Sequence, residues 1–209
     1  MKTSTKSILF GIHCFLIHPF FVAYAWYKLY GFPKDIRLWV AFFVHDLGYW
    51  GCENMDDEAG EQHPYFGAKI MHKLFDTKIA TCGIKDCPLC KDSELKNHYW
   101  YNFTLYHSRF LAKRSGAKFS KLCVADKLAI CLTPKWLYLP MANWSGEIKE
   151  YMKDSVKNTG GFVPTTNDQI QWKNGVDVYV KNWVEEHKDM KEDTWTSANR
   201  QADNNGVWK

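Results

Sequence analysis

The sequence lacks three patterns that would point away from a single helical domain. Runs of alternating apolar and polar residues, which mark half-buried β-strands, are almost missing. No internal repeat and no linker-like stretch divides the chain. These absences exclude a repeat array and a mainly β protein. They predict an all-α fold in one domain over residues 1–190, followed by a polar tail over 191–209 that has no apolar periodicity.

The chain also has little excess of positive over negative charge. Lys and Arg number 27 against 23 for Asp and Glu, which gives a formal charge of +4, and no long run of either sign occurs. This mildly basic balance suits a small anionic substrate and gives no footprint for duplex nucleic acid.

A long apolar run is missing as well. The apolar stretch 8–21 follows Lys2 and Lys6, so the start of the chain imitates a signal peptide. His13 and His18 interrupt it, however, and it is shorter than the ~20 residues that span a bilayer. We therefore expect a cytoplasmic protein without a membrane partner.

Cysteine is present, with seven residues, but the chain is too long and too rich in core residues for a disulfide scaffold. Cys82, Cys87 and Cys90 form a C-x4-C-x2-C turn of the kind that zinc loops use. A tetrahedral site needs a fourth ligand, for which His98 or His72 is available. Structural zinc and a metal-free loop of reduced thiols are the two interpretations.

Helical spacing of apolar residues recurs along the chain between capping residues such as Asp35 and Ser120. Pro19 and Pro64 suit first helical turns. The spacing predicts helices over 20–30, 36–47, 64–74, 94–111, 121–132, 146–157 and 168–186. The second of these carries His45 and Asp46 in its last turn.

Imidazoles and carboxylates occupy positions beside apolar residues, where a core would favour leucine. They are His18, His45, Asp46, His63, His107 and Asp126. A buried carboxylate without a counter-charge is costly, and a divalent cation among neutral imidazoles and carboxylates removes several such costs together. This set therefore predicts a metal centre.

Three segments carry a family resemblance: His18-Pro-Phe-Phe, Val44-His45-Asp46-Leu47 and Val124-Ala-Asp126-Lys127. Their order, a His, a His-Asp pair and a distal Asp, resembles the HD-domain superfamily of metal-dependent phosphohydrolases. The resemblance covers about residues 15–135. It implies a single HD-domain helical bundle, to which the C-terminal helices at about 145–190 are additions.

His63 and His107 lie between the His-Asp pair and Asp126, as in the six-ligand subset of that superfamily. This resemblance implies that Asp46 bridges two metals, with His18, His45 and Asp126 on one and His63 and His107 on the other. Iron, manganese, cobalt or zinc are the candidate ions. In a mononuclear centre, His63 and His107 would instead contact the substrate or pass protons.

The subset implies a phosphohydrolase that cleaves a nucleotide, dinucleotide or related phosphoester through a metal-bound hydroxide. Besides Asp46, the catalytic candidates include Arg109 and Lys127, which lie close in sequence to proposed ligands. Both are candidate phosphate contacts, although helix-borne cations are usually only solvated. Glu61 is a candidate for orienting the attacking water or a ligand imidazole. The alternatives are an HD-type mixed-valent di-iron oxygenase on the same ligands and a binding module with a structural metal. The sequence leaves the metal, the substrate and the oligomeric state open.

Overall fold

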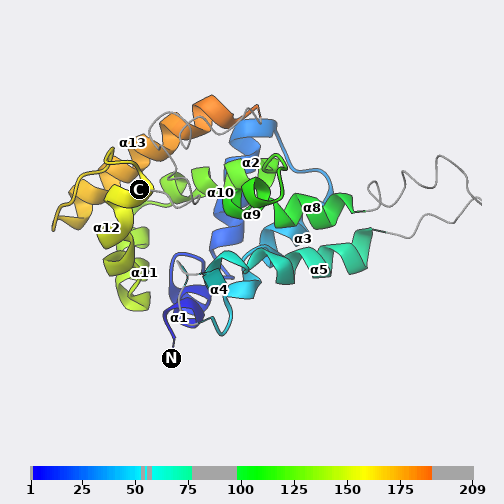
Figure 1. Ribbon diagram of the computed structural model, residues 1–209, viewed down its shortest axis with the longest axis horizontal. Helices are drawn as coiled ribbons and strands as arrows, with labels where there is room; N and C mark the ends of the chain where they lie inside the picture. Colours follow the sequence, from blue (N-terminus) through cyan, green and yellow to red (C-terminus); the bar gives the residue numbers. More distant parts are fainter. Residues whose placement is uncertain (1, 53–54, 56–57, 77–97, 190–209) are drawn as a thin grey trace, which may run out of the picture.

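A computed structural model describes residues 2–52, 55, 58–76 and 98–189. These residues form helices and turns and contain no strand, which confirms the predicted all-α fold (Figure 1). The helices are α1 Thr3–Phe10, α2 His18–Tyr30, α3 Ile36–Val44, η1 Leu47–Tyr49, α4 Glu58–Glu61, α5 Pro64–Phe75, α8 Tyr99–Leu105, α9 Arg109–Arg114, α10 Lys121–Leu132, α11 Lys135–Ser145, α12 Glu147–Asn158 and α13 Gln169–His187.

The centre of the fold is the pair formed by α2 and α10, and α3 packs beside α2. Helix α5 packs on α3 and also lies against α8 (Figure 1). Val22, Phe42 and Leu122, one from each of α2, α3 and α10, are fully buried in the core between these helices. Burying such a side chain contributes roughly 1.5–3 kcal/mol, so this cluster holds together the elements on which the predicted ligands lie.

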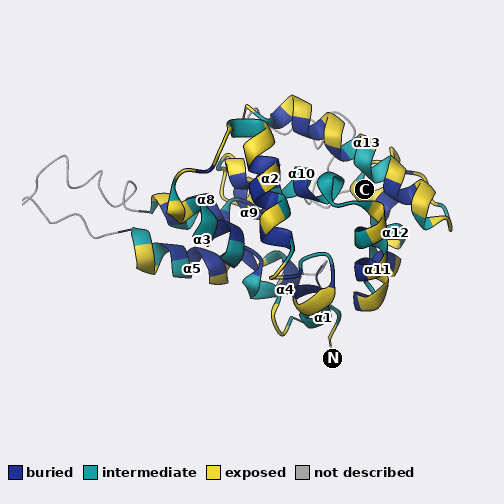
Figure 2. Cartoon of the chain, turned by 180° about the vertical axis from the view of Figure 1, so that it is seen from behind, coloured by how far each residue is buried: buried dark blue, intermediate teal, exposed yellow. Residues whose placement is uncertain are grey.

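The C-terminal helices form a second packed region. Helix α13 lies along α10, where Val180, Trp183 and Val184 are buried against Val124. Helix α11 packs on α1 and α12. In Figure 2, α13 shows exposed residues along its outer edge and buried residues along its inner side. Helix α10 is therefore packed against both α2 and α13.

Several predicted helix starts are confirmed by their hydrogen bonds. The Asp35 carboxylate accepts the N–H of Arg37 at 2.9 Å, before α3. Asp168 accepts the N–H groups of Ile170 and Gln171 at the start of α13. Proline stands in the first turn of α2 and of α5, as predicted. Ser120 also precedes α10, as predicted, but its side chain forms no capping hydrogen bond within the described residues. Capping residues therefore indicated where these helices begin, although the predicted bond does not form at every one.

The placing of His45 and Asp46 in the last turn of a helix over 36–47 is wrong. Helix α3 ends at Val44, His45 caps it, and the chain turns into the short η1. Gly48 sits in this turn directly against the backbone of His63, where a Cβ atom would overlap the carbonyl group. The turn is tight because the start of α5 packs onto it, a tertiary contact that helical spacing does not reveal.

The helix predicted over 94–111 is also wrong in extent, because the chain breaks between α8 and α9. Ser108 starts α9 by accepting the N–H of Leu111 at 3.2 Å, and His107 lies in the break. Helices α1 and α11, the latter with Pro140 inside it, were not predicted. Residues 94–97 and the predicted tail over 191–209 lie outside the described residues.

None of the helices that the structure describes combines the length and the apolar character needed to cross a bilayer.

Candidate metal centre

The six predicted ligands meet at one place, although they come from five separate parts of the fold. His18 opens α2, His45 and Asp46 follow α3, His63 precedes α5, His107 separates α8 from α9, and Asp126 lies on α10. Five of the six residues are buried, with at most 8% of their surface exposed, and Asp126 is partly buried. The structure thus brings together every residue that the sequence proposed for this set.

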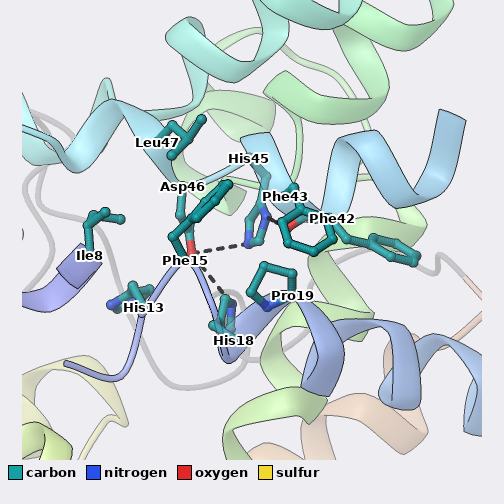
Figure 3. Close-up of a pocket in the computed structure, with 10 residues that line it drawn as sticks. All are labelled: Ile8, His13, Phe15, His18, Pro19, Phe42, Phe43, His45, Asp46 and Leu47. Atoms are coloured by element: carbon teal, nitrogen blue, oxygen red, sulfur yellow. Dashed lines mark hydrogen bonds and ion pairs between the residues drawn. The ribbon is translucent and has the colours of Figure 1, made fainter. Parts of the chain in front are cut away.

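Asp46 lies in the middle of the cluster. Its Oδ2 atom is 3.1 Å from His45 Nε2 and 3.4 Å from His18 Nε2, as the dashed lines in Figure 3 show. Its Oδ1 atom is 3.5 Å from His63 Nε2 and 3.4 Å from His107 Nε2. The two carboxylate oxygens therefore face different pairs of histidines.

Asp126 completes one side of the cluster. Its Oδ1 atom lies 3.0 Å from His18 Nε2 and 3.7 Å from His45 Nε2. Two groups of donor atoms result, each with its atoms within 4.8 Å of one another. One group is His18, His45, Asp46 and Asp126, and the other is Asp46, His63 and His107. This buried cluster could hold a metal ion.

Backbone contacts orient three of the imidazole rings in the same way. In His45, His63 and His107, Nδ1 lies 2.9, 2.7 and 2.6 Å, respectively, from the carbonyl oxygen three residues earlier. A carbonyl oxygen only accepts, so Nδ1 carries a proton in each ring. In a neutral ring Nε2 then has a free lone pair, and each Nε2 faces Asp46. Metal-binding histidines are commonly held by such a bond from their second nitrogen.

The donor atoms inside the cluster are arranged to contact a shared cation better than to bond to one another. His63 Nε2 lies 3.0 Å from His107 Nε2, so two neutral rings would point lone pairs at each other. His45 Nε2 and Asp46 Oδ2 are fully buried and form no hydrogen bond within the part of the chain that the structure describes. Imidazole and carboxylate donors suit iron, zinc and manganese, and a cation among them would satisfy these atoms together.

The electrostatics of the metal-free cluster show how its charge is balanced. Burial lowers the pKa of His45, but the Asp46 and Asp126 carboxylates outweigh it and raise this pKa to about 10. Burial and the neighbouring His107 lower the pKa of His63 to about 4, although Asp46 opposes them. Burial acts to raise the pKa of Asp46, yet its histidine neighbours hold it well below the usual range. A proton on His45 thus occupies the place that a metal would take.

A small pocket borders the cluster and exposes one histidine that the sequence analysis did not select. Figure 3 shows His13 beside His18, with Phe15, Phe43 and other apolar side chains forming the rest of the wall. The rings of His13 and His18 have centroids 5.6 Å apart.

Glu147 holds His13 in this position. His13 Nδ1 lies 3.1 Å from Glu147 Oε1 and 2.9 Å from Ser7 Oγ. Burial lowers the pKa of His13, but Glu147, with help from Asp46 and Asp126, raises it overall. Glu147 stands 134 residues away in sequence, so no local pattern links it to His13.

Glu61 and Arg109 contact residues outside the proposed ligand set. Glu61 Oε2 accepts a long hydrogen bond of 3.5 Å from Ser108 Oγ, next to His107. The Arg109 guanidinium lies over the Trp183 ring of α13, 4.9 Å from its centroid. Lys127 follows Asp126 on α10 and is half-buried. Their proposed contacts with substrate stay predictions.

The predicted zinc loop is described only at its edge. Cys82, Cys87 and Cys90 lie outside the described residues, whereas His98 lies inside them, beside His72.

Compared with known proteins, the chain matches no family model, no curated protein and no solved structure.

Proposed function

We propose that the chain is an HD-type metal-dependent phosphohydrolase that cleaves a nucleotide, a dinucleotide or a related phosphoester. The observation that carries the proposal is the position of Asp46. Its two oxygens face separate histidine pairs at 3.1–3.4 Å and 3.4–3.5 Å. A carboxylate shared in this way suits two neighbouring divalent ions, an arrangement that recurs in enzymes that displace phosphoryl groups.

The residues of the chain would divide the work of holding these ions. His18, His45 and Asp126 would hold one, His63 and His107 the other, and Asp46 both, consistent with the two donor groups. When bound, the ions would lower the pKa of a water molecule and withdraw charge from a phosphoryl oxygen. The Nδ1 contacts with backbone carbonyls fix the rings, so little reorganisation is required during turnover.

The pocket supports a substrate with a polar and an apolar part. The Nδ1 atom of His13 is engaged by Ser7 and Glu147, so Nε2 is the atom through which His13 can reach a substrate. Phe15 and Phe43 form the apolar part of the same pocket, which we expect to contact an apolar part of the substrate. We infer that Lys127 and Arg109 add positive charge for the phosphate.

The test is hydrolysis without oxygen. We would load the protein with Mn²⁺ under argon, incubate it with mixed nucleotides and dinucleotides, and follow phosphate and nucleotide products. The wild type and a control variant, Asp168→Asn, should release product, and Asp46→Asn should not. Asp168 is a suitable control because it is a carboxylate that only caps α13, and Asn is an equally good cap.

Two results would contradict the proposal. Turnover that required iron and consumed oxygen in step with product would identify an oxygenase on the same ligands. Metal that bound without any turnover, and whose removal unfolded the protein, would indicate a binding module with a structural metal.

A further inference from the structure

A second group of metal donors lies at the far end of α5 from the candidate centre. It consists of His72 and Asp76, at the end of α5, and His98, which precedes α8. One donor atom from each lies within 4.8 Å of the other two. His72 and Asp76 follow His63 by 9 and 13 residues along α5, so at 1.5 Å per residue the group lies roughly 14–20 Å from His63. The second group is therefore independent of Asp46.

The three side chains approach one another from two elements. His72 and Asp76 are four residues apart, which places them on one face of the helix, and His72 Nδ1 lies 3.2 Å from Asp76 Oδ2. The His98 ring stacks beside the His72 ring, with centroids 4.8 Å apart and planes at 29°. Two imidazoles are thus held parallel next to one carboxylate.

Asp76 is the fixed member of the group. Its side chain is only 3% exposed. Its Oδ1 atom accepts the N–H of Trp100, and its Oδ2 atom accepts the N–H of Tyr101, both at 2.9 Å. A carboxylate has about four acceptor positions, so each oxygen keeps one for another partner. Backbone bonds of this kind orient a ligand carboxylate in metal sites.

His72 provides access, because its side chain is 42% exposed. A hydrated ion could therefore reach the group from solvent, and water could complete its coordination. The group differs from an ordinary surface ion pair, which contributes only about 0–1 kcal/mol. An ion pair needs one imidazole and one carboxylate, whereas this group contains a second imidazole stacked on the first.

We propose that His72, Asp76 and His98 bind a divalent transition-metal ion of the zinc class. Two imidazole nitrogens and one carboxylate oxygen are a common zinc donor set. The ion would join the end of α5 to the start of α8 and so stabilise the packing of these two helices. This role is structural and separate from the proposed phosphohydrolase centre.

The experiment uses Zn²⁺ alone and the full-length protein. Zinc content after equilibrium dialysis would be compared in four proteins. They are the wild type, Asp46→Asn, and each of these two with His72→Asn/His98→Asn added. The double histidine variant should lose one equivalent of zinc in both backgrounds. Its affinity at this site should fall by at least about 100-fold, since losing even an outer-shell partner costs about 10–100-fold.

Lys73→Asn is the matched control, because Lys73 is the exposed neighbour of His72 on the same helix. It should keep all its zinc. The single variant His72→Asn, at a partly exposed position, provides a second measurement in case the double variant unfolds, and circular dichroism would verify its fold. It should weaken zinc binding at the same site.

X-ray absorption at the zinc edge, on protein carrying Asp46→Asn, would identify the ligands. Two imidazole nitrogens in the shell that disappear when His72→Asn/His98→Asn is added would support the proposal. A shell of sulfur alone would overturn it and favour the cysteine loop instead. Unchanged zinc content in the folded histidine variants, or equal loss in Lys73→Asn, would overturn it as well.

Discussion

Asp46 and Glu147 are both buried carboxylates, but their surroundings are opposite in kind. Glu147 is fully buried and is contacted by proton donors from every side: the hydroxyls of Ser7, Ser145 and Tyr151, the N–H of Ile12 and the His13 ring. Asp46 faces histidine nitrogens, and its Oδ2 atom has no hydrogen bond within the described chain. Both carboxylates are buried, but the hydrogen-bond donors around Glu147 satisfy it, whereas Asp46 Oδ2 has none within the described chain.

The difference shows which of the two buried carboxylates could gain from a bound cation. Burial acts to raise the pKa of Glu147, but His13, Ser145 and Ser7 hold it below the usual range, so protein groups alone stabilise its charge. Around Asp46 the same effect depends on histidines, among them a His45 that carries a proton. A metal can replace that proton and then satisfy the remaining lone pairs. Glu147 offers no comparable gain.

Replacing Asp46 should have the largest effect on metal binding and turnover. We expect Asp46→Asn to lose metal and to lower turnover by roughly a thousandfold, because a catalytic metal contributes several kcal/mol and each 1.36 kcal/mol is a factor of ten. Helix content should stay, since Asp46 lies beyond the end of α3. Metal analysis, turnover and circular dichroism would measure these effects. Full metal content and activity in this variant would refute the assignment of Asp46.

Replacing Glu147 should affect stability instead of metal binding. Glu147→Ala leaves His13 and several hydroxyls without their buried partner, and removing one member of a buried pair costs about 3–5 kcal/mol. Urea unfolding would measure the loss, with the metal stoichiometry unchanged. Glu185→Ala is the control, because Glu185 pairs with Lys188 at the surface, where a pair contributes about 0–1 kcal/mol. Loss of metal in a folded Glu147→Ala protein would contradict the expectation that Glu147, unlike Asp46, has no part in metal binding.

Gly67 tests whether the packing of α5 sets the metal geometry. A Cβ atom there would overlap the Val44 carbonyl and lie 3.1 Å from the Cα atom of His45. We expect Gly67→Ala to push α5 away from His45, costing about 1–3 kcal/mol through overpacking and weakening metal binding about tenfold. Gly175→Ala is the matched control, since its Cβ would meet only Val163 methyl groups, at 3.3 and 3.6 Å. Equal metal affinity in both alanine variants would show that this contact does not position His63.

The pH dependence of metal affinity should be the effect most specific to one ligand, His45. His45 has a pKa of about 10 in the metal-free cluster, so below this pH a metal must displace one proton. Affinity should therefore rise by about tenfold per pH unit between pH 6 and pH 9 and level off above the pKa. Competition with a chelator at several pH values would measure the slope, which Glu147→Ala should leave unchanged. A flat profile would mean that His45 is not a ligand.

Much of the metal cluster could be read from the sequence because its chemistry is unusual at each position. An imidazole or a carboxylate beside apolar neighbours, as at His18 and Asp126, needs a partner wherever the chain places it. Helix starts at Asp35 and Asp168 were likewise readable, because a cap depends only on residues next to it.

Features that depend on distant partners could not be read in this way. The break at His107 and the end of α3 at Val44 were missed, since apolar spacing continues through both. His13 was not selected as a site residue, because Glu147 reaches it only in the folded chain. His72 and His98 were considered for zinc only with the cysteines, and Asp76 was not considered at all.

The sequence by itself therefore determined the helical fold and most helix starts, because these follow from local spacing, and its side-chain chemistry together with the resemblance to the HD-domain superfamily indicated the candidate donors. Only the tertiary structure decided that the two oxygens of Asp46 face separate pairs of histidines. It also decided that Glu147 is already satisfied. The physical reason is that a buried charge is stabilised by whichever protons or lone pairs surround it in space, and helix packing brings those groups together from distant parts of the chain.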